Sequence, residues 1–100
     1  LGMTEMHALA FAPRVRVTGA VRQPVSIPYR QGMTVLDAVL QAGGVTDFAA
    51  ANRSRLHRRD RRGGVSTRDV RLGDILEGGE LESNVDVLPG DVITVPERAL

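Results

Sequence analysis

The fold is decided by the stretch GMTVLDAVLQAGG, which runs from Gly32 to Gly44. Its apolar residues recur at helical spacing and form one stripe, which consists of Val35, Leu36, Val39 and Leu40 and is widened by Ala38 and Ala42. Thr34 suits the N-cap position, and Asp37, three residues later, can complete a capping box. Gly43 suits the left-handed position that ends a helix. The stretch therefore predicts a helix of about nine residues that lays one face on a sheet.

Alternating segments on either side of this helix predict two β-hairpins. Residues 14–18 and 25–29 each alternate polar and apolar side chains, as half-buried strands do. Pro28 cannot donate a ladder bond, which implies that it lies on an edge strand or at a position without a ladder bond. Residues 53–59 and 65–71 predict the other hairpin, around a polar tip that contains glycine.

The last part of the chain returns to the sheet through a short helical segment and a tight turn. Residues 72–76 predict one helical turn before a Gly-Gly break. Pro89 and Gly90 fit the centre of a type II turn, where Gly supplies the positive φ. Residues 92–95 predict a buried last strand. The order β-β-α-β-β-(short helix)-β predicts an α+β fold of the β-grasp type. Its mixed sheet would have about five strands, with the first and last as parallel neighbours.

The composition fits one small domain. We expect a tail or linker at residues 1–13, the domain at 14–97 and a C-terminal tail at 98–100. The apolar share is 42%, but only three residues are aromatic, so aliphatic residues must form most of the core. Tyr29 and Phe48 are expected in that core. There is no cysteine, which excludes a disulfide framework, and no apolar run is long enough to span a membrane. The chain begins with Leu, which suggests a piece of a longer protein.

Charge is distributed unevenly along the chain, although the net charge is only +1. Residues 1–68 carry eleven arginines and four acidic residues, whereas residues 69–97 carry eight acidic residues and one arginine. Six arginines are concentrated around the second hairpin: Arg53, Arg55, Arg58, Arg59, Arg61 and Arg62. The acidic block supplies five candidates for the opposite side of a contact: Asp74, Glu77, Glu80, Glu82 and Asp86.

Four interpretations of the arginine cluster remain open at this point. It can be a solvated hairpin, which is what charge runs usually are. It can meet the acidic block of another copy in a head-to-tail contact that closes into a ring, or the two blocks can meet within one copy. It can bind an acidic polysaccharide. Nucleic acid is disfavoured, because the aromatic side chains that stack on single-stranded bases are missing.

The sequence offers little for catalysis or metal binding. His7 and His57 are far apart and have no ligand-spaced partner, so no metal site is expected. No serine sits in a Gly-rich elbow, and no Gly pair is followed by the Lys-Ser/Thr of a phosphate loop. The chain ends in Arg-Ala-Leu, without the free Gly-Gly of a β-grasp modifier. We therefore expect neither an enzyme nor a bound cofactor.

Four motifs in order resemble one family. They are VRVTGAVRQP at 15–24, GMTVLDA at 32–38, AGG at 42–44 and LPGDVITVP at 88–96. Together they resemble the soluble-ligand-binding β-grasp (SLBB) domain, above all the copies in bacterial outer-membrane polysaccharide export proteins. The motif positions are Gly19, Pro24, Gly32, Gly43, Gly44, Pro89, Gly90 and Asp91. The family usually has Pro-Gly where this chain has Pro24-Val25.

The resemblance implies a non-catalytic module on the periplasmic side of the bacterial outer membrane. Several copies would assemble into a ring or channel through which polysaccharide passes, in contact with inner-membrane export machinery. No cofactor, metal or nucleic acid is expected. Two alternatives remain: a module that binds a soluble sugar or a cofactor such as cobalamin, and a DNA-uptake module that uses the arginine hairpin.

Overall fold

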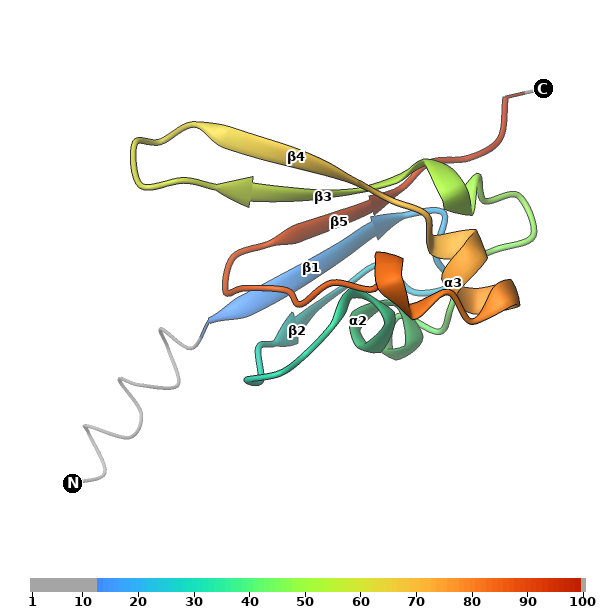
Figure 1. Cartoon of the computed structure of the whole chain (residues 1–100), viewed down its shortest axis with the longest axis horizontal. Coiled ribbons are helices and arrows are strands. Elements are labelled where there is room, and N and C mark those ends of the chain that lie inside the picture. Colours follow the sequence, from blue (N-terminus) through green and yellow to red (C-terminus); the bar gives the residue numbers. More distant parts are fainter. Residues whose placement is uncertain (1–12, 100) are drawn as a thin grey trace.

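The computed structural model describes residues 13–99, which form a five-stranded sheet with helices packed on one face (Figure 1). Residues 1–12, most of the expected N-terminal tail, and Leu100 lie outside the described residues. No helix within 13–99 has the length and apolar character needed to cross a bilayer.

The sheet is mixed and has the strand order β2-β1-β5-β3-β4. Its strands are β1 (Arg14–Gly19), β2 (Val25–Pro28), β3 (Ser54–Arg59), β4 (Val65–Val70) and β5 (Val92–Val95). The first and last strands, β1 and β5, run parallel at the centre, and the other pairs are antiparallel. The predicted α+β fold and the parallel pairing of first and last strands are therefore confirmed. Because β2 is an edge strand, Pro28 breaks no interior ladder.

Helix α2 (Val35–Gln41) is capped at both ends as the sequence predicts. The Asp37 N–H donates to Thr34 Oγ1 at 3.3 Å, and the Thr34 N–H donates to Asp37 Oδ2 at 3.0 Å. Gly43 has a φ of +83°. Its N–H and that of Gly44 each donate at 3.0 Å to carbonyls of the last turn, which is the Schellman arrangement. The helix has seven residues rather than about nine, because this arrangement closes it at Gln41.

One prediction about the apolar stripe of α2 is wrong. Val35, Ala38, Val39 and Ala42 are buried, but Leu40 is 57% exposed. Each residue turns the helix by about 100°, so Leu40 points away from the stripe centred on Val35. Leu36 is half-buried at the margin of the stripe.

The second helical segment is longer than predicted. Helix α3 (Leu72–Gly78) has seven residues, and Gly79 ends it with a left-handed φ of +67°. Leu72 and Ile75 are buried, so its inner face completes the helix layer. Two 3-10 helices, η1 (Ala51–Arg53) and η2 (Leu81–Ser83), connect the layers.

The core lies between this helix layer and one face of the sheet. Its sheet side is aliphatic and consists mainly of Val15, Val17, Ile27, Leu56, Val70, Ile93 and Val95. The expectation that Phe48 is a core residue is wrong, since it is 68% exposed. The reason is that the segment around Phe48 pairs with the residues after β5: Ala49 bridges Glu97, and the Arg98 N–H donates to the Phe48 carbonyl at 2.8 Å. Tyr29 is half-buried against the core.

Candidate functional site

The six clustered arginines do not form one surface, because strand residues alternate between the two faces of the sheet. Arg58 shares the core face with Leu56 and is half-buried. Arg55 and Arg59 lie on the opposite face, beside Arg53 at the start of β3. Arg61 and Arg62 occupy the exposed hairpin tip.

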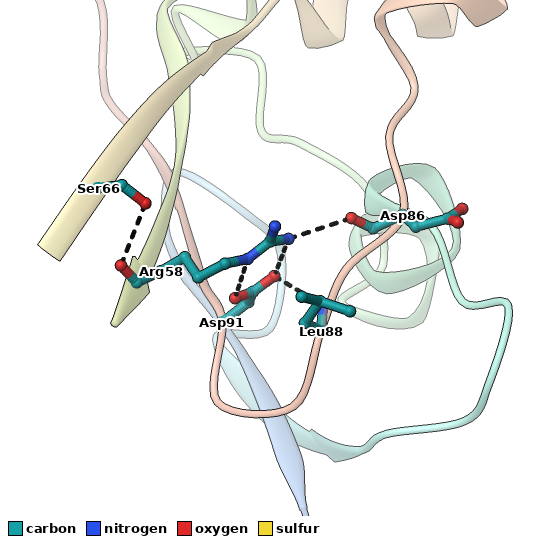
Figure 2. A network of polar contacts seen from close by, with 5 residues as sticks. All are labelled: Arg58, Ser66, Asp86, Leu88 and Asp91. Carbon is teal, nitrogen blue, oxygen red and sulfur yellow. Dashed lines mark hydrogen bonds and ion pairs between the residues drawn. The ribbon is translucent and has the colours of Figure 1, made fainter. Parts of the chain in front are cut away.

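Arg58 forms an ion pair with the turn that leads into β5 (Figure 2). Its Nε donates to Asp91 Oδ1 at 3.0 Å, and a terminal nitrogen donates to Asp91 Oδ2 at 2.8 Å. The same terminal nitrogen reaches the Asp86 carbonyl at 3.4 Å. The hydrogen bond with Asp91 raises the pKa of the Arg58 guanidinium above its ordinary value, so it stays charged.

Asp91 is 1% exposed and also caps the turn with its side chain. The Leu88 N–H donates to Asp91 Oδ2 at 2.7 Å. Gly90 has a φ of +88°, and the Asp91 N–H donates to the Leu88 carbonyl at 3.1 Å, as a Pro-Gly turn requires. The motif Pro89-Gly90-Asp91 therefore has a structural role. It forms the turn before β5 and, through Asp91, binds Arg58 of β3.

The other motif positions are also structural. A Cβ at Gly19 would overlap the carbonyl oxygen of Val95, so only glycine allows β1 and β5 to approach this closely. Gly32 has a φ of +84° in the loop before α2. Pro24 follows the bend between β1 and β2. These residues set the path of the backbone.

Two arginines that were not predicted as site residues also lie on the exposed face of the sheet. Arg14 and Arg16 of β1 point to the same side as Arg55 and Arg59 of β3, with β5 between the two strands. Arg16 lies opposite Val92, and Val92 lies opposite His57. Adjacent strands are about 5 Å apart, so the two arginine rows are about 10 Å apart.

We use the term open face for the strand residues on this side of the sheet. They are Arg14, Arg16, Thr18, Ser26, Pro28, Arg55, His57, Arg59, Val65, Thr67, Asp69, Val92 and Thr94. Among them Asp69 is the only acidic residue, and its contact with Arg55 is a long 3.6 Å between exposed side chains. Such a pair contributes little, so the open face is strongly basic.

Two hollows lie on the open face. The first, of about 540 Å³, is lined by Thr18, Gly19, Arg53, Arg55, His57, Thr94, Val95 and Pro96. The second, of about 670 Å³, is lined by Arg14, Arg16, Ser26, Arg59, Pro89, Gly90 and Val92. Every ionisable residue of their linings is an arginine or a histidine. Each hollow thus combines guanidinium groups with a hydroxyl group.

Hydrogen bonds within the open face hold several of these side chains in place. The two ring nitrogens of His57 lie 3.1 Å from Thr67 Oγ1 and 3.0 Å from Thr94 Oγ1. Arg14 donates to the hydroxyl and the carbonyl of Ser26, at 2.8 and 2.7 Å. Arg14 thus uses its Nε and one terminal nitrogen within the open face.

The acidic block occupies the helix layer. Asp74 and Glu77 lie on α3, and Glu80, Glu82 and Asp86 follow it around η2. Asp74 is engaged within the chain, because Arg71 donates to it at 2.6 Å and Asn52 at 3.1 Å. These two hydrogen bonds, that of Arg71 first, lower the pKa of the Asp74 carboxyl. The acidic block thus lies on the core side of the sheet, where Arg58 and Arg68 also lie, and not on the open face.

Among residues 13–99, no group of three His, Cys, Asp or Glu side chains is placed to hold a metal ion. Both ring nitrogens of His57 contact threonine hydroxyls, and Ser66 donates to the Arg58 carbonyl at 3.3 Å. In the Ser-His-Asp arrangement the third group that orients the histidine is a carboxylate, whereas both groups that contact the His57 ring are threonine hydroxyls.

A family model described as the SLBB domain matches residues 14–70, more than half of the chain. The match covers β1 to β4 and α2, and therefore includes every arginine that lines the two hollows. A search of curated proteins finds no match. SLBB domains are binding or structural modules that are found in periplasmic polysaccharide export proteins.

Proposed function

Since the chain belongs to the SLBB domain family, we propose that it is a non-catalytic module of a bacterial polysaccharide export protein. It would work on the periplasmic side of the outer membrane, in contact with inner-membrane export machinery. Several copies would form a ring or channel through which polysaccharide passes without chemical change.

The observation that carries this proposal is the separation of charge between two surfaces of one small domain. The β3–β4 hairpin extends beyond the first residue of β5, because β5 pairs only with Arg55–His57 of β3 (Figure 1). Its tip is ordered by Asp60, whose Oδ1 accepts from the Arg62 and Gly64 N–H groups at 2.8 Å each. The tip therefore presents the exposed side chains of Arg61 and Arg62 from an ordered turn.

A head-to-tail contact follows from this geometry. The basic tip of one copy faces away from its own acidic helix layer and complements the helix layer of the next copy. Such a heterologous contact closes into a ring when the rotation between copies permits. It also leaves the open face available, because the tip and the open face are separate surfaces.

Charge reversal tests the contact. Arg61→Glu with Arg62→Glu should abolish self-association in sedimentation at low salt, and so should Glu80→Arg with Glu82→Arg. A mixture of the two variants should associate again, because each supplies the charge that the other now needs. Arg22→Glu with Arg30→Glu, a matched change away from the tip, should associate like the parent chain. Failure of the mixture to associate would refute the tip contact.

The export role is tested separately in the producing bacterium. Deletion of the gene should reduce polysaccharide at the cell surface while polymer accumulates inside the cell, and the intact gene should restore export. Normal surface polysaccharide in the deletion strain would contradict the export role, whatever the outcome of sedimentation.

The alternative function is a module that binds a soluble ligand. The two hollows of the open face favour it, and their polar linings suit a sugar better than a large apolar cofactor. A DNA-uptake role has less support, since the open-face residues include no aromatic side chain for base stacking.

A further inference from the structure

The arginines around the two hollows outnumber the acidic residues on the same face. Arg53 and Arg55 line the first hollow, and Arg14, Arg16 and Arg59 line the second. Apart from Asp69 at the outer strand, the acidic residues of the described chain lie elsewhere, and Asp91 is already bound to Arg58. Concentrated positive charge in hollows attracts anions.

We infer that the open face binds a segment of an acidic polysaccharide, with one carboxylate in each hollow. The inference rests on the proposed export function only for the choice of a polysaccharide as the ligand. The anionic character of the ligand follows from the residues of the open face. A guanidinium fork matches a planar carboxylate with two parallel hydrogen bonds, which a neutral sugar does not offer.

The floor between the two hollows is β5. Thr94 belongs to the first hollow and Val92 to the second, and two strand residues span about 7 Å. The two guanidinium groups of the first hollow are thus separated from those of the second by a short, continuous floor. A polymer that carries a carboxylate on successive sugars can engage both hollows, whereas a single acidic sugar engages one.

The hydroxyl groups of the linings favour an acidic sugar over other anions. Thr18, Thr94 and Ser26 each make one hydrogen bond within the chain, and a hydroxyl group, with one donor and two acceptor sites, keeps capacity for a sugar hydroxyl. Nucleic acid would gain from phosphate contacts but would find no Phe, Tyr or Trp among the open-face residues to stack its bases. A second copy of this chain would bring the carboxylates of its helix layer, of which Asp74 is already bound to Arg71 and Glu80 and Glu82 meet the hairpin tip in the proposed contact.

Titration calorimetry of the 100-residue chain with defined oligosaccharides tests the inference. The probes are galacturonate hexamer, galacturonate monomer, neutral maltohexaose and a short oligothymidylate. The acidic hexamer should bind at about 50 mM salt and weaken at about 300 mM, because exposed charges are screened. It should bind more than roughly tenfold tighter than the monomer, since the second carboxylate binds at high effective concentration. Maltohexaose should not bind.

Paired variants locate the site. Arg16→Gln with Arg55→Gln removes one guanidinium from each hollow and should weaken hexamer binding by roughly tenfold or more. Arg61→Gln with Arg62→Gln makes the same change in net charge at the tip and should change it by less than about twofold. Arg55→Lys, which keeps the charge but loses the fork, should be intermediate. Thermal melts of each variant establish that it is folded.

Several results would overturn the inference. They are no binding of the acidic hexamer at low salt, equal affinities for hexamer and monomer, equal losses in the face and tip variants, or tighter binding of oligothymidylate than of the hexamer. Concentration-dependent association that the Arg16 and Arg55 variant abolishes would reassign the face to a second copy. Because these measurements use the purified chain, they are independent of the gene-deletion test of export.

Discussion

Arg58 and Asp91 are 33 residues apart in sequence, yet their side chains form a two-point ion pair of 3.0 and 2.8 Å. The pair fastens the β3–β4 hairpin to the turn from which β5 starts (Figure 2). Since β5 is the floor of both hollows, this contact also fixes the two arginine rows relative to each other. A buried carboxylate in such a place requires its partner, because an unpaired buried charge is costly.

Removal of Arg58 should therefore destabilise the domain more than removal of the charge on Asp91. Arg58→Met leaves the Asp91 carboxylate buried without its partner and should cost about 2–3 kcal/mol in urea unfolding. The cost is below that of a fully buried pair, because the Arg58 side chain is 38% exposed. Asp91→Asn keeps an acceptor for the Leu88 N–H and should cost about 1 kcal/mol.

The double variant distinguishes a true pair from two independent effects. Arg58→Met with Asp91→Asn should be more stable than the sum of the single variants predicts, by about 1 kcal/mol or more. Strict additivity of the two changes in the free energy of unfolding would contradict the pairing.

Gly19→Ala should be among the most damaging small substitutions in this chain. Gly19 has a φ of +93°, and a Cβ would overlap the Val95 carbonyl oxygen, so strain and collision add. We expect a loss of more than about 3 kcal/mol in the free energy of unfolding. Gly44→Ala is the matched control: φ is +82° but nothing lies within 4 Å of the new Cβ. It should cost only about 1 kcal/mol. Similar costs for both would exclude the close approach of β1 and β5 as the cause.

Loss of the helix cap should have a moderate effect. Thr34→Ala removes the hydroxyl that accepts from the Asp37 N–H and should cost about 1 kcal/mol in urea unfolding. Thr34→Ser keeps the hydroxyl and should stay within about 0.5 kcal/mol of the parent chain. If the two substitutions destabilise equally, the hydroxyl does not act as a cap.

Stability should depend on pH through Asp74. Hydrogen bonds from Arg71 and Asn52 lower its pKa in the folded state. A lowered folded pKa contributes stability that is present above the ordinary carboxyl pKa of about 4 and is lost as pH falls through the folded value. Asp74→Asn should therefore be less stable than the parent chain at neutral pH, and the difference should shrink below about pH 4. A difference that stays constant from pH 7 to pH 2.5 would show that the carboxylate charge does not contribute.

Local chemistry was sufficient to predict the elements of this fold. The capping box at Thr34 and Asp37, the glycines at 43 and 44 and the Pro-Gly turn each act within a few residues. Their outcome therefore did not depend on the rest of the chain. The errors concern residues whose burial depends on what packs over them: Leu40 turns out of the stripe, and Phe48 is held outward by pairing with the C-terminal residues.

The candidate site was only partly predictable. The sequence located the arginine cluster around the second hairpin. It did not reveal that Arg58 has Asp91 as its partner, because a contact across 33 residues leaves no local pattern. It also did not identify Arg14 and Arg16 as site residues, although the predicted pairing of the first and last strands already placed these two arginines beside the last strand.

The sequence by itself determined the α+β order of elements, the ends of α2 and the family, because caps, turns and periodicity are short-range properties of the chain. Only the tertiary structure decided which arginines act together. The parallel pairing of β1 with β5 and the antiparallel pairing of β5 with β3 bring Arg16 and Arg59 to one face and send Arg58 to the other. Side-chain alternation makes each such assignment depend on strand register, which is fixed only when the whole sheet has formed.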